Sequence, residues 1–289
     1  MTIGMTQYHR LGRSLAMLVA FGASTAAAAE PATPWSGFEE AEVRLISGQT
    51  AAGQEQTLQF GLQFRVNDGW KTYWRYPGEA GAAPRMDWSA SQNVAGIQVD
   101  WPAPHRFSAF GFDNFGYDKD FVLPIAVTPQ SAGRPVDLAL KLDYLVCSDI
   151  CVPGEAELRL TLADGAAASS AFAPVIADFR RKVPPRGESS PFSLGDPSLE
   201  GEPGQEVLRL KLAAKSALTA PDLLVEVAQP LSLGRPEVSL SDDGLAAEVR
   251  FKVFDGGSKQ SLAGQAMRLT VIDGTQSGEH ILRLQPRAE

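Results

Sequence analysis

The sequence of 289 residues contains few of the side chains on which metal and nucleophilic sites depend, with two cysteines and three histidines. Zinc commonly takes four ligands from cysteine and histidine, and His105 and His280 are widely separated in the sequence. A cysteine–histidine nucleophilic pair would depend on His105, and no hydrolase motif lies near it. These scarcities argue against a zinc site and against a cysteine hydrolase.

The sequence also lacks an excess of positive charge, a glycine-rich phosphate loop and a long apolar run. Its 26 Lys and Arg residues stand against 34 Asp and Glu residues, which gives a formal net charge of −8. Without a basic patch, neither nucleic acid nor an anionic lipid surface is a predicted partner. No stretch after the N-terminal segment approaches the ~18 consecutive apolar residues of a membrane span.

The first 29 residues have the organisation of a secretory signal peptide. A positively charged start is followed by an apolar run at residues 15–23 and by small residues at 27–29. We therefore predict cleavage near Ala29, a periplasmic location and a mature chain without a membrane span.

Short β-type runs separated by turn residues occupy residues 38–162. Residues 56–66 place Leu58, Phe60, Leu62, Phe64 and Val66 on one face by simple alternation. Similar runs occur at 41–47, 97–101, 121–127, 136–146 and 156–162. Sustained helical periodicity is missing from this region, which favours an antiparallel β-sandwich.

A second β-rich region follows a small-residue segment and one short helix, predicted at residues 171–182. The sequence therefore predicts an all-β protein with two β-sandwich domains in tandem and one short linking helix. The predicted limits are a signal peptide at 1–29, a first domain at 30–165, a linker at 166–190 and a second domain at 191–289.

The two cysteines, Cys147 and Cys151, are separated by three residues among apolar neighbours typical of strands. In one continuous strand they would lie roughly 13 Å apart, too far for a disulfide. A hairpin loop at 148–150 would make them cross-strand neighbours at about 4.5–5.5 Å between Cα atoms, which suits a disulfide. Asp149 favours a turn. We interpret the motif as a hairpin that carries a closable dithiol.

Three hypotheses for this pair remain open from the residues alone. Two cysteines in an exported protein most often form a structural disulfide. Such a bond stabilises chiefly by closing a loop in the unfolded chain, and a three-residue loop gains little. This weak gain favours a redox pair or a Cu(I) site over a structural bond.

An aromatic stretch at residues 104–117 lies between two predicted strands. It carries Phe107, Phe110, Phe112, Phe115 and Tyr117 among glycines and polar residues. We interpret it as a loop, either folded over an apolar patch or acting as a lid that shields a reactive group.

Three segments together carry a resemblance to a known family. Residues 144–153 with the cysteines, 68–78 with the sequence Asp-Gly-Trp-Lys-Thr-Tyr-Trp-Arg-Tyr-Pro-Gly, and 117–124 resemble the N-terminal periplasmic domain of the DsbD family. The ScsB-type branch, named for suppression of copper sensitivity, is the most similar. The resemblance covers about residues 35–162, and the second β-rich region also resembles the longer ScsB-type ectodomain.

The resemblance implies immunoglobulin-like domains and a thiol-disulfide exchange function, of the protein-disulfide reductase type, that needs no cofactor. Electrons would pass from a membrane-embedded thiol reductase to oxidised periplasmic thioredoxin-fold proteins. The sequence contains no membrane domain of its own, so a separate electron donor is expected. The alternative is a copper-binding module, or a structural adhesion module with a structural disulfide.

The resemblance also implies roles for individual residues. Cys151 would form mixed disulfides and Cys147 would resolve them. A cap at 107–112 would shield the pair, with Phe110 or Phe107 as the covering ring and Phe112 beside it. The residues expected to line the site are Trp70, Tyr73, Trp74, Tyr117 and Asp149. No metal is expected at the pair, because Asp149 and Glu155 supply neither methionine nor histidine donors.

Overall fold

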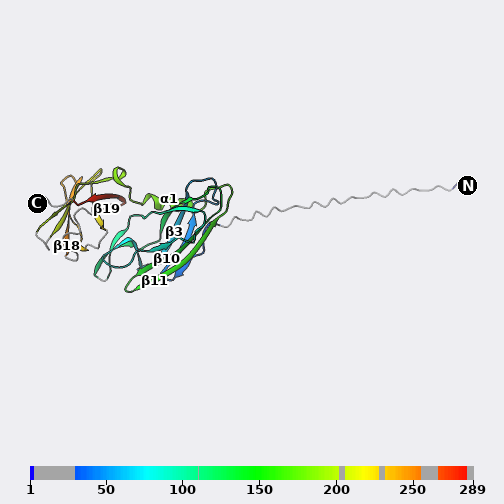
Figure 1. The fold of residues 1–289 in the computed structure, drawn as a ribbon, viewed down its shortest axis with the longest axis horizontal. Helices are drawn as coiled ribbons and strands as arrows, with labels where there is room; N and C mark the ends of the chain where they lie inside the picture. The colour runs from blue at the N-terminus through cyan, green and yellow to red at the C-terminus, as the bar shows by residue number, and fades with distance from the viewer. Residues whose placement is uncertain (3–29, 110, 202–205, 228–231, 255–265, 285–289) are drawn as a thin grey trace.

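The computed structural model describes residues 1–2, 30–109, 111–201, 206–227, 232–254 and 266–284. Almost all of the predicted signal peptide, and Phe110 of the predicted cap, lie outside the described residues. Two β-rich lobes follow one another along the long axis of the molecule (Figure 1). Among the described residues, no helix is long and apolar enough to cross a membrane.

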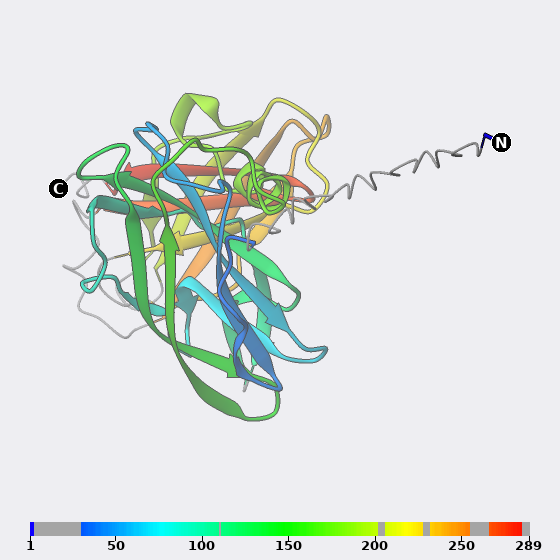
Figure 2. The ribbon, with the colours of Figure 1, turned by 90° about the vertical axis from the view of Figure 1, so that its right-hand side faces the viewer.

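The first lobe is a sandwich of two antiparallel sheets. One sheet has the order β1-β2-β3-β9-β6, with bounds Ser36–Phe38, Ala41–Ser47, Leu58–Val66, Phe121–Pro129 and Val94–Val99. The other has the order β11-β10-β4-β8-β7, with bounds Cys151–Leu162, Val136–Cys147, Lys71–Gly78, Phe112–Tyr117 and His105–Ala109. A short strand, β5 (Arg85–Asp87), pairs with β10. Figure 2 shows the long β10–β11 hairpin in green.

Alternation along the strands builds the core between these sheets. The five apolar residues predicted to share a face of β3 are all buried in one hydrophobic cluster. In β10 the even-numbered residues from Val136 to Val146 are buried in the same cluster, so the odd-numbered residues point away from it. This arrangement confirms the predicted all-β sandwich, and it leaves Cys147 on the outer face of its sheet.

The expectation of a loop at residues 104–117 is wrong, because the segment forms the β7–β8 hairpin. Gly116 explains why the segment has a loop-like sequence although it forms strands. A Cβ atom there would lie 1.9 Å from the carbonyl oxygen of Thr72, so glycine permits a close backbone approach within the sheet. The glycine that suggested a loop is therefore a requirement of strand packing.

The predicted helix is present as α1 (Ala173–Arg181) and covers the outer face of the first sheet. Phe172 and Ile176 pack there against Ile46 of β2 and Val122 of β9. The segment expected as a linker thus contacts the first lobe. The domain limits given above stay a prediction.

The second lobe also consists of two antiparallel sheets around its own core. One contains β12-β14-β18-β16 with β13 and β17 beside it, bounded by Phe192–Leu194, Val207–Ala214, Ala246–Phe254, Ser232–Leu233, Ser198–Glu200 and Glu237–Leu240. The other is β15-β19-β20, bounded by Asp222–Glu226, Ala266–Asp273 and Gln276–Arg283. Leu224 of β15 is buried in the cluster of the first lobe, so the two lobes share packed surface.

Candidate functional site

The two cysteines pair directly across the β10–β11 hairpin. Cys147 and Cys151 form a disulfide, and their Cα atoms lie 4.1 Å apart. In the connecting loop, the N–H group of Ser148 donates to the carbonyl oxygen of Ile150 at 2.8 Å. These contacts confirm the hairpin that the cysteine spacing predicted.

The two halves of the disulfide differ sharply in exposure. Cys147 is only 1% exposed, although it lies on the outer face of the sheet. Cys151 begins the edge strand β11 and is exposed, and its neighbour Ile150 is exposed as well. An attacking group therefore has access to the bond from the Cys151 side.

Two aromatic rings account for the burial of Cys147. Tyr73 of β4 and Phe107 of β7 form a separate buried cluster with it, and Ala109 and Leu145 pack at the margin. The ring centroids of Tyr73 and Phe107 lie 5.8 Å apart. We call these two rings the sulfur cover. The structure brings together four predicted site residues here: Cys147, Cys151, Tyr73 and Phe107.

The hydroxyl group of Tyr73 makes a polar contact with the buried sulfur. It donates to Sγ of Cys147 at 3.2 Å. Burial raises the pKa of Tyr73 above its ordinary value, so the phenol stays protonated at neutral pH and remains a donor. The site thus contains a hydrogen-bond donor aimed at one particular sulfur.

Two glycines make room for the sulfur cover. At Gly81, whose φ is +87°, a Cβ atom would lie 2.2 Å from the ring of Tyr73. At Gly116 it would lie 3.1 Å from the ring of Phe107. Sequence reasoning missed both positions. Glycines near an aromatic motif were the available signal, since they mark close approaches as well as turns.

Lys71 is a further residue that sequence reasoning missed. It pairs with Cys147 across β4 and β10, and its Nζ atom lies 5.9 Å from the ring centroid of Phe107. A cation near a cysteine favours the thiolate form, whereas Asp149 and Glu155 oppose it. Lys71 precedes Tyr73 by two residues, so the alternation that places Tyr73 on the outer face of the sheet also places Lys71 there.

Trp74 and Tyr117 lie on the other face of the sheet, in the core of the first lobe. The hydroxyl group of Tyr117 donates to the carbonyl oxygen of Pro102 at 2.8 Å, and burial raises its pKa well above the ordinary value. In β4, Tyr73 faces outward, so the adjacent Trp74 must face inward. Neither residue is gathered with the cysteines.

The remaining predicted residues lie at the surface or outside the described chain. Asp149 is exposed in the hairpin loop. Phe112 is 48% exposed at the start of β8, and Phe110 is outside the described residues. Of the described residues of the predicted cap, Phe107 is the one that packs in the buried cluster with Cys147, and its role as a cap stays a prediction.

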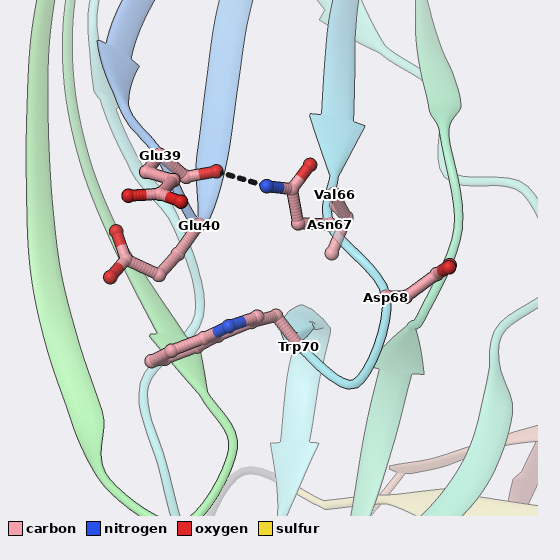
Figure 3. Close-up of a pocket in the computed structure, with 6 residues that line it drawn as sticks. All are labelled: Glu39, Glu40, Val66, Asn67, Asp68 and Trp70. Atoms are coloured by element: carbon pink, nitrogen blue, oxygen red, sulfur yellow. Dashed lines mark hydrogen bonds between the residues drawn. The ribbon is translucent and has the colours of Figure 1, made fainter.

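Trp70 packs against the core of the first lobe and borders an open surface groove of about 630 Å³. Glu39, Glu40, Val66, Asn67 and Asp68 also line it. The side-chain amide of Asn67 donates to the carbonyl oxygen of Glu39 at 2.6 Å, and Glu40 lies on the same side as the indole (Figure 3). Asp68 points to the opposite side (Figure 3). The groove is acidic with one aromatic wall.

The described residues contain no group of three or more His, Cys, Asp or Glu side chains that could hold a metal ion.

Known proteins resemble the chain in both sequence and structure. Residues 42–163 match the family described as thiol:disulfide interchange protein DsbD, N-terminal, and residues 182–286 match a domain family of unknown function, DUF8393. The crystal structure of the N-terminal periplasmic domain of ScsB from Proteus mirabilis matches with a TM-score of 0.72 and 24% identity. That match covers 89% of this chain and 99% of the other.

A marsupial T cell receptor gives a TM-score of 0.18 at 10% identity, over 86% of this chain and 99% of the other. No curated protein matches the chain. The likeness to the Proteus mirabilis domain agrees with the two-lobe all-β fold described above.

Proposed function

We propose that this chain is a thiol-disulfide exchange protein of the periplasm, a function supported by the match of residues 42–163 to the DsbD N-terminal family. The observation that carries the proposal is the unequal burial of the disulfide. Cys151 is exposed at an edge strand, while Cys147 is buried under the sulfur cover. Exchange requires access to one sulfur and a stabilised leaving group at the other.

In the reducing half-reaction, a thiolate of an electron donor attacks Sγ of Cys151. The bond between the two sulfurs of this chain breaks, a mixed disulfide forms at Cys151, and Cys147 leaves as a thiolate. The second thiolate of the donor then attacks the mixed disulfide and releases Cys151. The donor has lost two electrons, and Cys147 and Cys151 have become a dithiol after taking up two protons.

In the oxidising half-reaction, the thiolate of Cys151 attacks the disulfide of an acceptor protein. One acceptor sulfur leaves as a thiolate, and a mixed disulfide again links the acceptor to Cys151. Cys147 then attacks Cys151, releases the second acceptor sulfur and restores the disulfide of this chain. Two electrons have passed to the acceptor.

Tyr73 supports both half-reactions through its contact with Cys147. Its hydroxyl group lies 3.2 Å from the sulfur that departs in the first step and attacks in the last. A hydrogen bond to the thiolate stabilises the departing sulfur and lowers the pKa of the thiol. The positive charge of Lys71, opposite Cys147 in the sheet, acts in the same direction.

Phe107 directs the reaction to the exposed sulfur. The residue is 7% exposed and shields Cys147 together with Tyr73. Small oxidants are therefore kept from Cys147, and a partner that presents a cysteine at the edge strand reaches Cys151.

The partners follow from the family of the first domain. We assign the donor role to a membrane-embedded thiol reductase and the acceptor role to oxidised thioredoxin-fold proteins. The described similarity to a periplasmic domain of ScsB supports the location. The exchange uses cysteine sulfur alone, so the mechanism needs no organic cofactor.

Trapping on single-cysteine variants tests this function. Reduced Cys147→Ser and Cys151→Ser proteins are incubated with an oxidised thioredoxin-fold protein and separated without reductant. We expect Cys147→Ser to accumulate a mixed disulfide, because Cys151 is accessible and the resolving sulfur is missing. The matched Cys151→Ser variant should accumulate far less. No adduct with either variant, or equal adducts with both, would contradict the proposal.

A further inference from the structure

The second lobe contacts the β7–β8 hairpin that carries one ring of the sulfur cover. β7 is the edge strand of its sheet, and Arg106 lies on it directly before Phe107. Any contact that fixes Arg106 therefore fixes the backbone from which the Phe107 ring projects. Both strands of the hairpin are held in this way by side chains of the second lobe.

The first contact joins β7 to β15. Arg106 donates to both carboxylate oxygens of Asp222, at 3.0 and 2.8 Å, and to the carbonyl oxygen of Leu223 at 3.2 Å. Its side chain is 13% exposed, and its guanidinium carbon lies 4.8 Å from the ring centroid of Phe115. An arginine that pairs with a carboxylate through two nitrogen atoms, is largely buried and stacks on a ring has a well-defined position.

The second contact joins β8 to the second lobe. Arg235 donates to the two carboxylate oxygens of Asp113, at 2.7 Å from Nε and 2.6 Å from Nη2. Asp113 also accepts from Arg106 at 3.3 Å, so one carboxylate connects both contacts. Ser108 of β7 pairs with Asp113 of β8, close to Phe107.

We propose that the second lobe braces the sulfur cover: Asp222 and Arg235 hold the β7–β8 hairpin, and with it Phe107, over the sulfur of Cys147. These two are positioning residues, because they act through Arg106 and Asp113 and touch neither cysteine. The brace gives the second lobe a role in setting the accessibility of the disulfide. The inference rests on the proposed function only where it says what the sulfur cover is for.

The rate at which the Cys147 thiol is alkylated measures the accessibility of the covered sulfur. Reduced full-length Cys151→Ser protein, in which Cys147 is the remaining cysteine, is treated with iodoacetamide, and the adduct is counted by mass over time. We expect Asp222→Asn and Arg235→Gln, each combined with Cys151→Ser, to react roughly three- to tenfold faster than Cys151→Ser alone. Tenfold corresponds to about 1.4 kcal/mol, which is the order of one hydrogen bond to a charged group.

Glu248→Gln is the matched control, because it breaks an ion pair with Arg209 within the second lobe. Combined with Cys151→Ser, it should be alkylated at the same rate as Cys151→Ser alone. Circular dichroism and the melting temperature establish that each variant is folded. If Asp222→Asn unfolds the second lobe, Arg235→Gln decides, since its side chain is 63% exposed and its loss should leave the lobe intact.

Unchanged rates in folded Asp222→Asn and Arg235→Gln would overturn the brace. A Glu248→Gln rate as high as theirs would also overturn it, because general loosening of the second lobe would then explain the effect. Iodoacetamide needs no docking surface. A failure of exchange with protein partners would therefore leave this measurement intact and point to the proposed function instead.

Discussion

The hydroxyl oxygen of Tyr73 lies 3.2 Å from the sulfur of Cys147, and both residues are about 99% buried. The other half of the disulfide, Cys151, is exposed. One sulfur thus has a fixed donor and a cover, and its partner has access to solvent. This asymmetry gives each cysteine a different chemical role.

Tyr73→Phe should make the disulfide harder to reduce. The change removes the O–H donor and keeps the ring, so the Cys147 thiolate of the reduced state loses its hydrogen bond. We expect the reduction potential to become more negative by about 30 mV, which corresponds to about 1.4 kcal/mol. Tyr144→Phe is the control, since Tyr144 donates to the carbonyl oxygen of Ala41 instead. Equal potentials for Tyr73→Phe and wild type would argue against the donor role.

Phe107→Ala should expose Cys147 more than it destabilises the fold. A buried Phe→Ala change in a main core costs about 3–5 kcal/mol. Phe107 belongs to a small outer cluster, so we expect a smaller loss and clearly faster alkylation of the reduced pair by a bulky reagent. Phe115→Ala, on the core side of the same hairpin, should show the reverse pattern. Large destabilisation with unchanged alkylation would place Phe107 among ordinary core residues.

His105 should make the protein less stable in mild acid. Burial lowers its pKa below the ordinary value, with Lys71 and Lys119 acting in the same direction and Asp118 in the opposite one. The unfolded chain therefore binds the proton at higher pH, and stability falls as pH drops from about 6.5 toward the folded pKa. The pKa of His280 is lowered as well and contributes with the same sign.

The melting temperatures of wild type and His105→Gln, each measured at about pH 7.5 and pH 5, check this sign. The variant should lose less stability between the two conditions, and the remaining loss includes that of His280. An identical loss in both proteins would remove His105 from the explanation.

Removal of both cysteines should leave the first lobe folded. The disulfide closes a short loop, for which the chain-entropy model gives about 2 kcal/mol or less. The β10–β11 hairpin also retains its register through eleven further paired positions, from Val136 and Leu162 to Val146 and Val152. We expect Cys147→Ala/Cys151→Ala to melt cooperatively at a moderately lower temperature than oxidised wild type. Collapse of the fold would favour a structural disulfide.

Local pattern predicted most of the first lobe. The alternation in residues 56–66 and the spacing of Cys147 and Cys151 depend on neighbours in sequence, and both the strand and the hairpin are present. The β7–β8 hairpin was missed because Gly116 meets the backbone of Thr72, a partner 44 positions earlier in the numbering. A single sequence does not display such a partner.

In the candidate site, too, local pattern predicted some features, and contacts between distant residues decided the others. Tyr73 and Trp74 are adjacent in one motif, so only one of them can face the cysteines. Which one does is set by the pairing of β4 with β10. The brace is still less visible, because Arg106 and Asp222 come from opposite lobes and are 116 residues apart. Long-range ion pairs depend on how folded domains pack against each other, and the local residue pattern carries little information about that packing.

Equilibration with glutathione buffers tests the central claim, that Cys147 and Cys151 form a redox-active pair. The oxidised fraction is measured by alkylation and mass across a series of glutathione ratios, with circular dichroism on the same samples. We predict reversible opening at a potential above about −300 mV, with the fold retained in both states. A pair that stays oxidised below about −300 mV, or that opens only as the first lobe unfolds, would contradict the account.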